Sequence, residues 1–222
     1  MGVFATLVVA TFNFAQTIGW FTVLALLLHA LYLDPVAAFW NPRLGASRAV
    51  NLYVRMQKWQ IVDVLLPIFG FTRTNIISSA GQTGLRCVYG LISLPLMEEF
   101  LPIIFPTLMC FALVEPWRYG YNLWTTVGLK DTYIGRMFGF FRWNLFLVIY
   151  PLGAIGDGLG AVFCIPTVQA SNPPMYSVTM PNKWNFAFSY LYFLYFLPVI
   201  YVLGFPHNYM YLLNKRRQYY AP

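Results

Sequence analysis

The stretch FRWNLFLVIYPLGAIGDGLGAV, residues 141–162, is apolar over most of its length but includes Arg142, Tyr150 and Asp157. A charged side chain inside a bilayer costs about 2.5–3.5 kcal/mol on insertion scales, so such residues usually face the protein interior and pair or react there. Tyr150 and Asp157 are seven residues apart, which in a helix is about 700° and within roughly 20° of two full turns. The stretch therefore predicts a membrane helix with a phenol and a carboxylate on the same face.

The composition of the whole chain points to the same class of protein. Of 222 residues, 59% are hydrophobic and only 9% are charged, whereas a soluble domain has about 25% charged residues. The net charge of +7 is spread over loops and the C-terminal tail, so we expect no nucleic-acid-binding surface. The chain has two histidines and no C-x-x-C, P-loop or G-x-S-x-G motif, so we expect neither a cofactor nor a metal site.

Hydrophobic segments of about 20 residues predict membrane spans, and the chain contains six of them. We therefore expect an all-α integral membrane protein: a single domain over residues 1–222, folded as a six-helix bundle with both termini on one side. The predicted spans are 3–31, 52–71, 76–94, 101–127, 137–165 and 184–205.

Polar residues recur inside four of these spans, which indicates a shared interior because lipid-facing positions would be penalised. Glu115 and Arg118 are three residues apart and should be neighbours on one helical face. Arg86 needs a carboxylate partner from another span, and the sequence leaves Asp63, Glu115 and Asp157 open. The set predicts either a packed ion network or a substrate-facing cavity, and its members are Asp63, Gln82, Arg86, Glu115, Arg118, Arg142, Tyr150 and Asp157.

The backbone around Tyr150 is also unusual. Pro151 has no amide hydrogen, so the carbonyl of Leu147 loses its helical partner. Four glycines follow within ten residues, beginning with Gly153. They predict either a small-residue face for close helix packing or a kink that opens a pocket beside Tyr150.

The order and spacing of these motifs resemble the membrane 3-hydroxyacyl-CoA dehydratases, also called protein-tyrosine-phosphatase-like proteins, over nearly the whole chain. Each motif alone is weak, but together they are specific. The matching segments are Asn13 with Gly19-Trp20, Gln82 with Arg86, Glu115 to Tyr119, Tyr150 to Asp157 (YPLGAIGD), 175–188 and 204–217.

This resemblance implies an enzyme of the endoplasmic-reticulum membrane that acts in very-long-chain fatty-acid elongation. It would remove water from a (3R)-3-hydroxyacyl-CoA to give the trans-2-enoyl-CoA, with Tyr150 and Asp157 as the catalytic pair. Which of the two acts as acid and which as base is left open. The other intramembrane polar residues and Gly153 would support the site or bind substrate. The implied partners are the acyl-CoA, membrane lipids and other elongation enzymes.

The chain departs from the family pattern near the site. The family's catalytic Glu is Asp157 here, its Glu in the second span is Asp63, and its next His is Leu66. These changes raise an alternative: a catalytically degenerate protein with the dehydratase fold that serves as a structural subunit of a larger complex, for example in the mitochondrial inner membrane.

Overall fold

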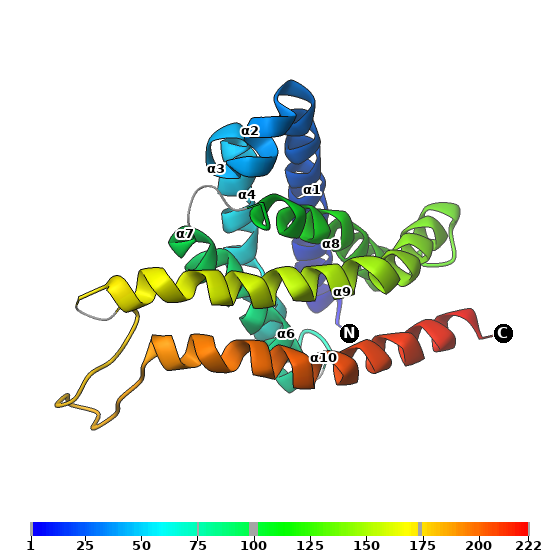
Figure 1. Cartoon of the computed structure of the whole chain (residues 1–222). Coiled ribbons are helices and arrows are strands. Elements are labelled where there is room, and N and C mark those ends of the chain that lie inside the picture. The colour runs from blue at the N-terminus through cyan, green and yellow to red at the C-terminus, as the bar shows by residue number, and fades with distance from the viewer. Residues whose placement is uncertain (1, 75, 98–101, 173–174, 222) are drawn as a thin grey trace.

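The computed structural model describes residues 2–74, 76–97, 102–172 and 175–221, apart from the side chains of residues 77, 78 and 82. Within these ranges the chain is all-helical, and the one β-type pairing is an isolated bridge between Val178 and Phe188. The elements (Figure 1) are α1 (Val3–Leu33), α2 (Pro35–Trp40), α3 (Pro42–Gly45), α4 (Ser47–Trp59), α5 (Val62–Ile68), α6 (Ile76–Cys87), the π-helical segment η1 (Val88–Ser93), α7 (Leu94–Leu96), α8 (Ile104–Thr126), α9 (Tyr133–Ala170) and α10 (Tyr190–Tyr220).

Three of the described helices, α1, α9 and α10, are long and apolar enough to cross a membrane, with 31, 38 and 31 residues. They correspond to the first, fifth and sixth predicted spans. The sixth differs in its bounds, because the helix begins at Tyr190 rather than at residue 184 and continues through the basic tail to Tyr220. The chain is thus an all-helical integral membrane protein.

The second predicted span is not one helix. Gln60 and Ile61 form a turn that divides it into α4 and α5. Helix α4 is amphipathic rather than uniformly apolar: Ala49, Tyr53 and Met56 are buried, whereas its three basic residues lie on the exposed face, namely Arg48, Arg55 and Lys58. The number of apolar residues in this segment predicted a span, but their helical period makes α4 amphipathic.

Helix α8 lies at the centre of the fold, packed against α1 on one side and α9 on the other, and α10 lies alongside α9 (Figure 1). Gly156 allows α9 to approach Thr107 of α8 so closely that an added Cβ would clash. Gly160 does the same against Tyr89 of η1. Two of the glycines after Tyr150 therefore serve close helix packing, and α9 continues as one helix through Pro151.

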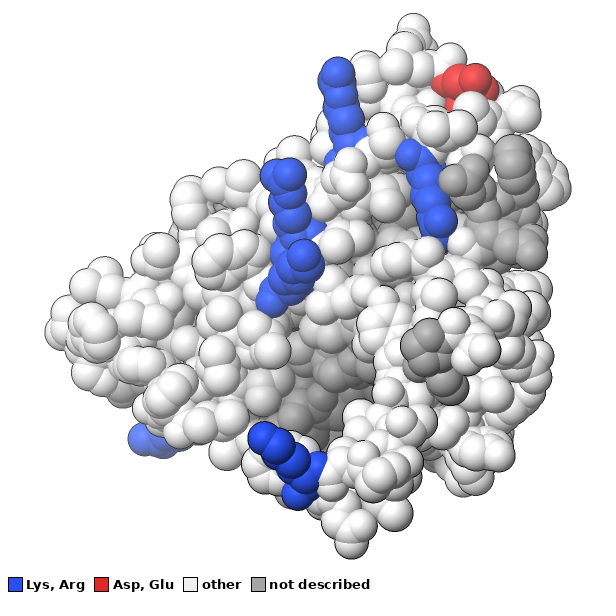
Figure 2. Space-filling model, turned by 90° about the vertical axis from the view of Figure 1, so that its left-hand side faces the viewer, with Lys and Arg blue, Asp and Glu red and all other residues white. Residues whose placement is uncertain are grey.

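The surface is largely uncharged. Figure 2 shows one face on which a few basic side chains and one small acidic patch are surrounded by uncharged residues. Large apolar side chains are exposed along the outer faces of the long helices, including Phe14, Ile18, Val148, Ile155 and Val202. Such a surface suits lipid contact rather than water.

Candidate active site

A cavity of about 440 Å³ lies between α6, α8, α9 and α10. Tyr150, Gly153 and Asp157 line it from α9, so the predicted common face of this helix is confirmed and it faces the cavity. Arg86 of α6 and Glu115 of α8 are among its other polar lining residues. The rest of the wall is mostly apolar, which matches a site that has to take up an apolar molecule.

Asp157 is only 7% exposed, and its two carboxylate oxygens have different environments. The hydroxyl of Tyr201 on α10 donates a hydrogen bond to Oδ2 at 3.1 Å. Oδ1 is buried and has no partner among the described residues. A buried polar atom without a partner costs about 1–3 kcal/mol, so Oδ1 is the oxygen with hydrogen-bonding capacity left for a ligand.

Tyr150 is held by aromatic contacts with α10. Its ring stacks on Phe205 at a centroid distance of 5.4 Å and on Tyr209 at 6.3 Å. The hydroxyl of Tyr209 also donates to the Leu147 carbonyl at 3.1 Å. This is the carbonyl that Pro151 leaves without a helical partner, so the proline creates an acceptor that ties α10 to α9 beside Tyr150.

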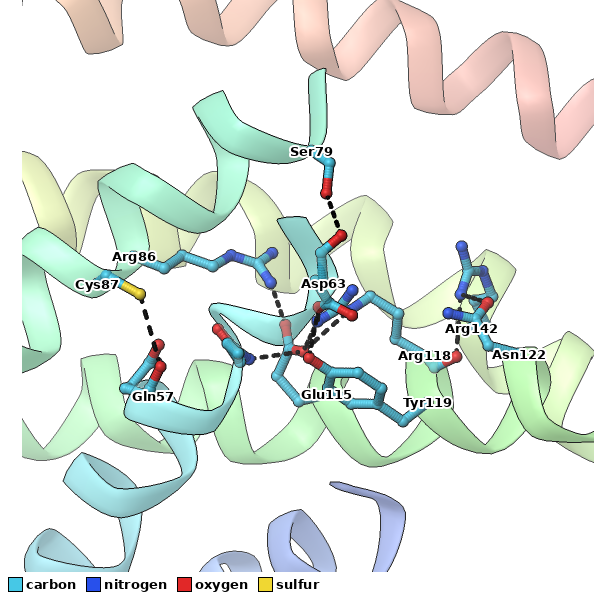
Figure 3. Close-up of polar contacts among 11 residues, drawn as sticks. Gln57, Asp63, Ser79, Arg86, Cys87, Glu115, Arg118, Tyr119, Asn122 and Arg142 are labelled. Atoms are coloured by element: carbon cyan, nitrogen blue, oxygen red, sulfur yellow. Dashed lines mark hydrogen bonds and ion pairs between the residues drawn. The ribbon is translucent and has the colours of Figure 1, made fainter. Parts of the chain in front are cut away.

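A network of charged side chains borders the cavity (Figure 3). Glu115 is fully buried and is its centre: it pairs with Arg86, and with Arg118 at 2.6 Å between Nη2 and Oε2. Gln60 also donates to Glu115 at 3.2 Å. The predicted Glu115–Arg118 pair is therefore confirmed, and among the carboxylates left open for Arg86 the structure selects Glu115.

Asp63 of α5 joins the network from its other side. Its Oδ2 accepts from Arg118 Nη2 at 3.1 Å and from the Tyr119 hydroxyl at 2.6 Å. Arg142 of α9 lies beyond Arg118 (Figure 3) and donates through Nη1 to the Arg118 carbonyl and to Asn122 Oδ1, at 3.0 and 2.9 Å.

Two kinds of predicted site residue thus occur together: a phenol and a carboxylate that line a cavity, and an ion network beside it. The backbone of Gln82 lies in α6, but its side chain falls outside the described part of the chain. Within the described residues, no group of three or more His, Cys, Asp and Glu side chains is placed to hold a metal ion.

Several polar residues of the site escaped the sequence analysis. Tyr201, Tyr119 and Gln60 hydrogen-bond to the three carboxylates, and His207 lines the cavity. Tyr201 gave no signal because the chain has sixteen tyrosines, whereas Tyr119 belongs to the matching segment Glu115 to Tyr119. His207 was the more visible clue, since it lies in the segment 204–217 that carries part of the family resemblance.

The fold and the site together define an integral membrane protein of helices that surround a cavity with a phenol and a carboxylate in its wall. The family model described as protein tyrosine phosphatase-like protein, PTPLA, matches residues 57–222. The chain belongs to this family.

Curated relatives match over nearly the whole chain. The mouse protein named very-long-chain (3R)-3-hydroxyacyl-CoA dehydratase 1 is 28% identical over 98% of this chain and 74% of its own length. The rice protein named very-long-chain (3R)-3-hydroxyacyl-CoA dehydratase PASTICCINO 2A is 27% identical over 96% of this chain and 92% of its own. A shorter match, to the human protein named very-long-chain (3R)-3-hydroxyacyl-CoA dehydratase 2, is 36% identical over 77 residues, 35% of this chain and 30% of that protein's length. No solved structure gives a significant match.

Proposed function

We propose that this protein is a very-long-chain (3R)-3-hydroxyacyl-CoA dehydratase that acts in fatty-acid elongation. The observation that carries the proposal is the cavity whose wall includes both Tyr150 and Asp157. Relatives in mouse and rice that align with nearly the whole of this chain are named for this activity. A catalytically degenerate scaffold would not require an open interior at this position, and the cavity therefore favours the enzyme over the structural subunit.

The reaction suits the two side chains. The thioester acidifies the proton on C2, and a base removes it. The electron pair of that C–H bond becomes the C2=C3 double bond, and the C3–O bond breaks as an acid protonates the departing hydroxyl to give water. Positioned acid and base groups each contribute about 10²–10⁴-fold to such a step. We assign these two tasks to Tyr150 and Asp157.

The surrounding residues support this assignment. Oδ1 of Asp157 lacks a partner among the described residues and can meet the substrate. Tyr201 fixes the other oxygen of the same carboxylate. We assign Gly153 the task of leaving room for the acyl chain, because it lines the cavity and has no side chain to fill it.

The ion network has a supporting part in the proposal. Arg86 lines the cavity while Glu115 pairs with it, so its guanidinium is held where it can face the thioester. Asp63 and Arg118 anchor this arrangement from the adjoining helices. Gln82 is proposed as a further substrate contact on the strength of the family motif alone.

The proposal includes six membrane spans within the single domain 1–222, made by α1, the α4–α5 pair, α6 to α7, α8, α9 and α10. It also includes the endoplasmic reticulum as the location, because the family resemblance implies that membrane. Other elongation enzymes would then be neighbours that supply the hydroxyacyl-CoA and consume the enoyl-CoA.

The test is turnover by purified protein in detergent. Wild type should convert a long-chain (3R)-3-hydroxyacyl-CoA to the trans-2-enoyl-CoA, and Tyr150→Phe, which removes only the hydroxyl, should abolish the conversion. If wild type and Tyr150→Phe are equally inert and native mass spectrometry finds stoichiometric partner subunits, the structural alternative is correct.

A further inference from the structure

A second cavity, of about 480 Å³, adjoins the first, and its wall is rich in cations. Its lining includes residues from the last turn of α8, the first third of α9 and the basic tail of α10, and these helix ends lie at the same end of the molecule (Figure 1). Its lining includes Arg86, Arg118, Arg142 and Lys215 but, among the described residues, a single carboxylate, that of Asp63. Hydroxyl and amide side chains supply most of the remaining polar surface.

The carboxylates within reach of this cavity are already engaged. Asp63 accepts from Arg118 and Tyr119, and Glu115 pairs with Arg86 and Arg118. Arg142, in contrast, donates to two neutral oxygens, and no described carboxylate forms an ion pair with it. The network thus contains three arginines and two carboxylates, so one positive charge is in excess. A partly buried cation without a counter-charge favours an anionic ligand.

Lys215 adds a second charge, at the outer part of the cavity, that no described carboxylate pairs with. Its side chain is exposed, and its ammonium lies 5.8 Å from the ring centroid of Tyr211, one helical turn earlier in α10. Arg142 thus places one cation in the wall of the second cavity, and Lys215 places another at its exposed edge. This arrangement suits an anion that enters from water.

The two cavities are neighbours, because Arg86, Val114 and Tyr150 line both of them. A long ligand can therefore place an apolar part beside Tyr150 and Asp157 and an anionic part beside Arg142. An acyl-CoA has this layout: an acyl thioester at one end, an uncharged pantetheine arm, and phosphate groups at the other end.

We propose that the second cavity binds the phosphate groups of the CoA moiety, with Arg142 and Lys215 as the contacting cations. Arg142 uses only Nη1 for its two described hydrogen bonds, which leaves N–H groups of its guanidinium for phosphate oxygens. Lys215 acts as a point charge at the entrance. The inference rests on the proposed function, since it takes the substrate to be a CoA ester.

The experiment measures CoA binding to purified protein in detergent by titration calorimetry. Arg142→Gln should weaken binding roughly tenfold or more, as the loss of a charge-assisted hydrogen bond predicts. Lys215→Gln should weaken CoA binding less, and the CoA affinity of this variant should depend less on salt concentration than that of wild type. The matched control is Arg217→Gln, which removes an exposed charge two residues from Lys215 but outside the lining of both cavities; its affinity should not change.

Pantetheine, which lacks the phosphates of CoA, is the second probe. Its binding should be weak and the same in wild type, Arg142→Gln and Lys215→Gln. Because Lys215 is exposed, its variant should fold normally even if Arg142→Gln does not. Wild-type affinity for CoA in Lys215→Gln and in folded Arg142→Gln would overturn the assignment. Binding of phosphatidic acid in place of CoA would also overturn it, since the cavity would then hold a lipid headgroup.

Failure of this inference and failure of the proposed function give different results. A protein that dehydrates the substrate with unchanged KM in Arg142→Gln is a dehydratase without this phosphate site. A protein that binds CoA in an Arg142-dependent manner but converts no hydroxyacyl-CoA has the phosphate site and lacks the proposed activity.

Discussion

Replacing Glu115 by Gln should destabilise the protein strongly, because this fully buried carboxylate holds two arginines. It pairs with Arg86 and with Arg118 and also accepts from Gln60. Glutamine is nearly isosteric, but it is neutral and turns an NH₂ donor toward guanidinium donors. The side chains of Arg86 and Arg118 would then remain 17% and 24% exposed without their shared counter-charge.

The magnitude follows from that exposure. Removing one partner of a buried ion pair costs about 3–5 kcal/mol, and the partial exposure of the arginines places the loss near the lower end. At about 2–4 °C per kcal/mol for a chain of this size, a loss of about 3 kcal/mol lowers Tm by about 6–12 °C. Thermal unfolding of purified protein in one detergent measures this difference.

The matched control is Asp131→Asn, which neutralises an exposed carboxylate that takes part in none of the described ion pairs. Its Tm should stay close to that of wild type. A Glu115→Gln variant as stable as Asp131→Asn would refute the claim that the buried network stabilises the fold.

Three further predictions concern the cavity. Asp157→Glu should raise kcat, up to about 100-fold, because one more methylene restores about 1 Å of reach; unchanged or lower turnover in steady-state assays would argue against a reach-limited carboxylate. Tyr201→Phe should lower kcat about tenfold and shift the pH dependence of kcat/KM, since the Asp157 carboxylate loses a hydrogen bond of about 1.5 kcal/mol; a wild-type pH profile would deny Tyr201 this role. Gly153→Leu should fill part of the cavity and raise KM, whereas Gly158→Leu, whose added Cβ meets open space, should not; equal effects of the two leucines would contradict the cavity assignment.

The sequence was sufficient to predict the parts of the fold that depend on local hydrophobicity. The long apolar runs around Trp20 and Tyr150 predicted α1 and α9, and the seven-residue spacing placed Tyr150 and Asp157 on one face. The separation of α4 from α5 was not predicted. Average hydropathy over residues 52–71 does not distinguish one continuous span from an amphipathic helix followed by a short apolar one.

The charged residues of the site and the pair Glu115–Arg118 within one helix were predictable, but the pairing between helices was not. An intramembrane charge is conspicuous because it is costly, which is why Asp63, Arg86, Glu115 and Arg118 were found. The choice of Glu115 over Asp157 as the partner of Arg86 depends on how α6 and α8 pack, and no local pattern encodes that. Tyr201 is uncharged in an aromatic-rich helix, so its contact with Asp157 became visible only in three dimensions.

The most direct test of the central claim compares dehydration by wild type, Tyr150→Phe, Asp157→Asn and the double variant, each shown to be folded. If the two side chains act as one acid–base pair, each single variant should lose at least about 100-fold in kcat, and the double variant should lose little more than either. Wild-type turnover in either single variant would contradict the claim that Tyr150 and Asp157 carry the chemistry of this cavity.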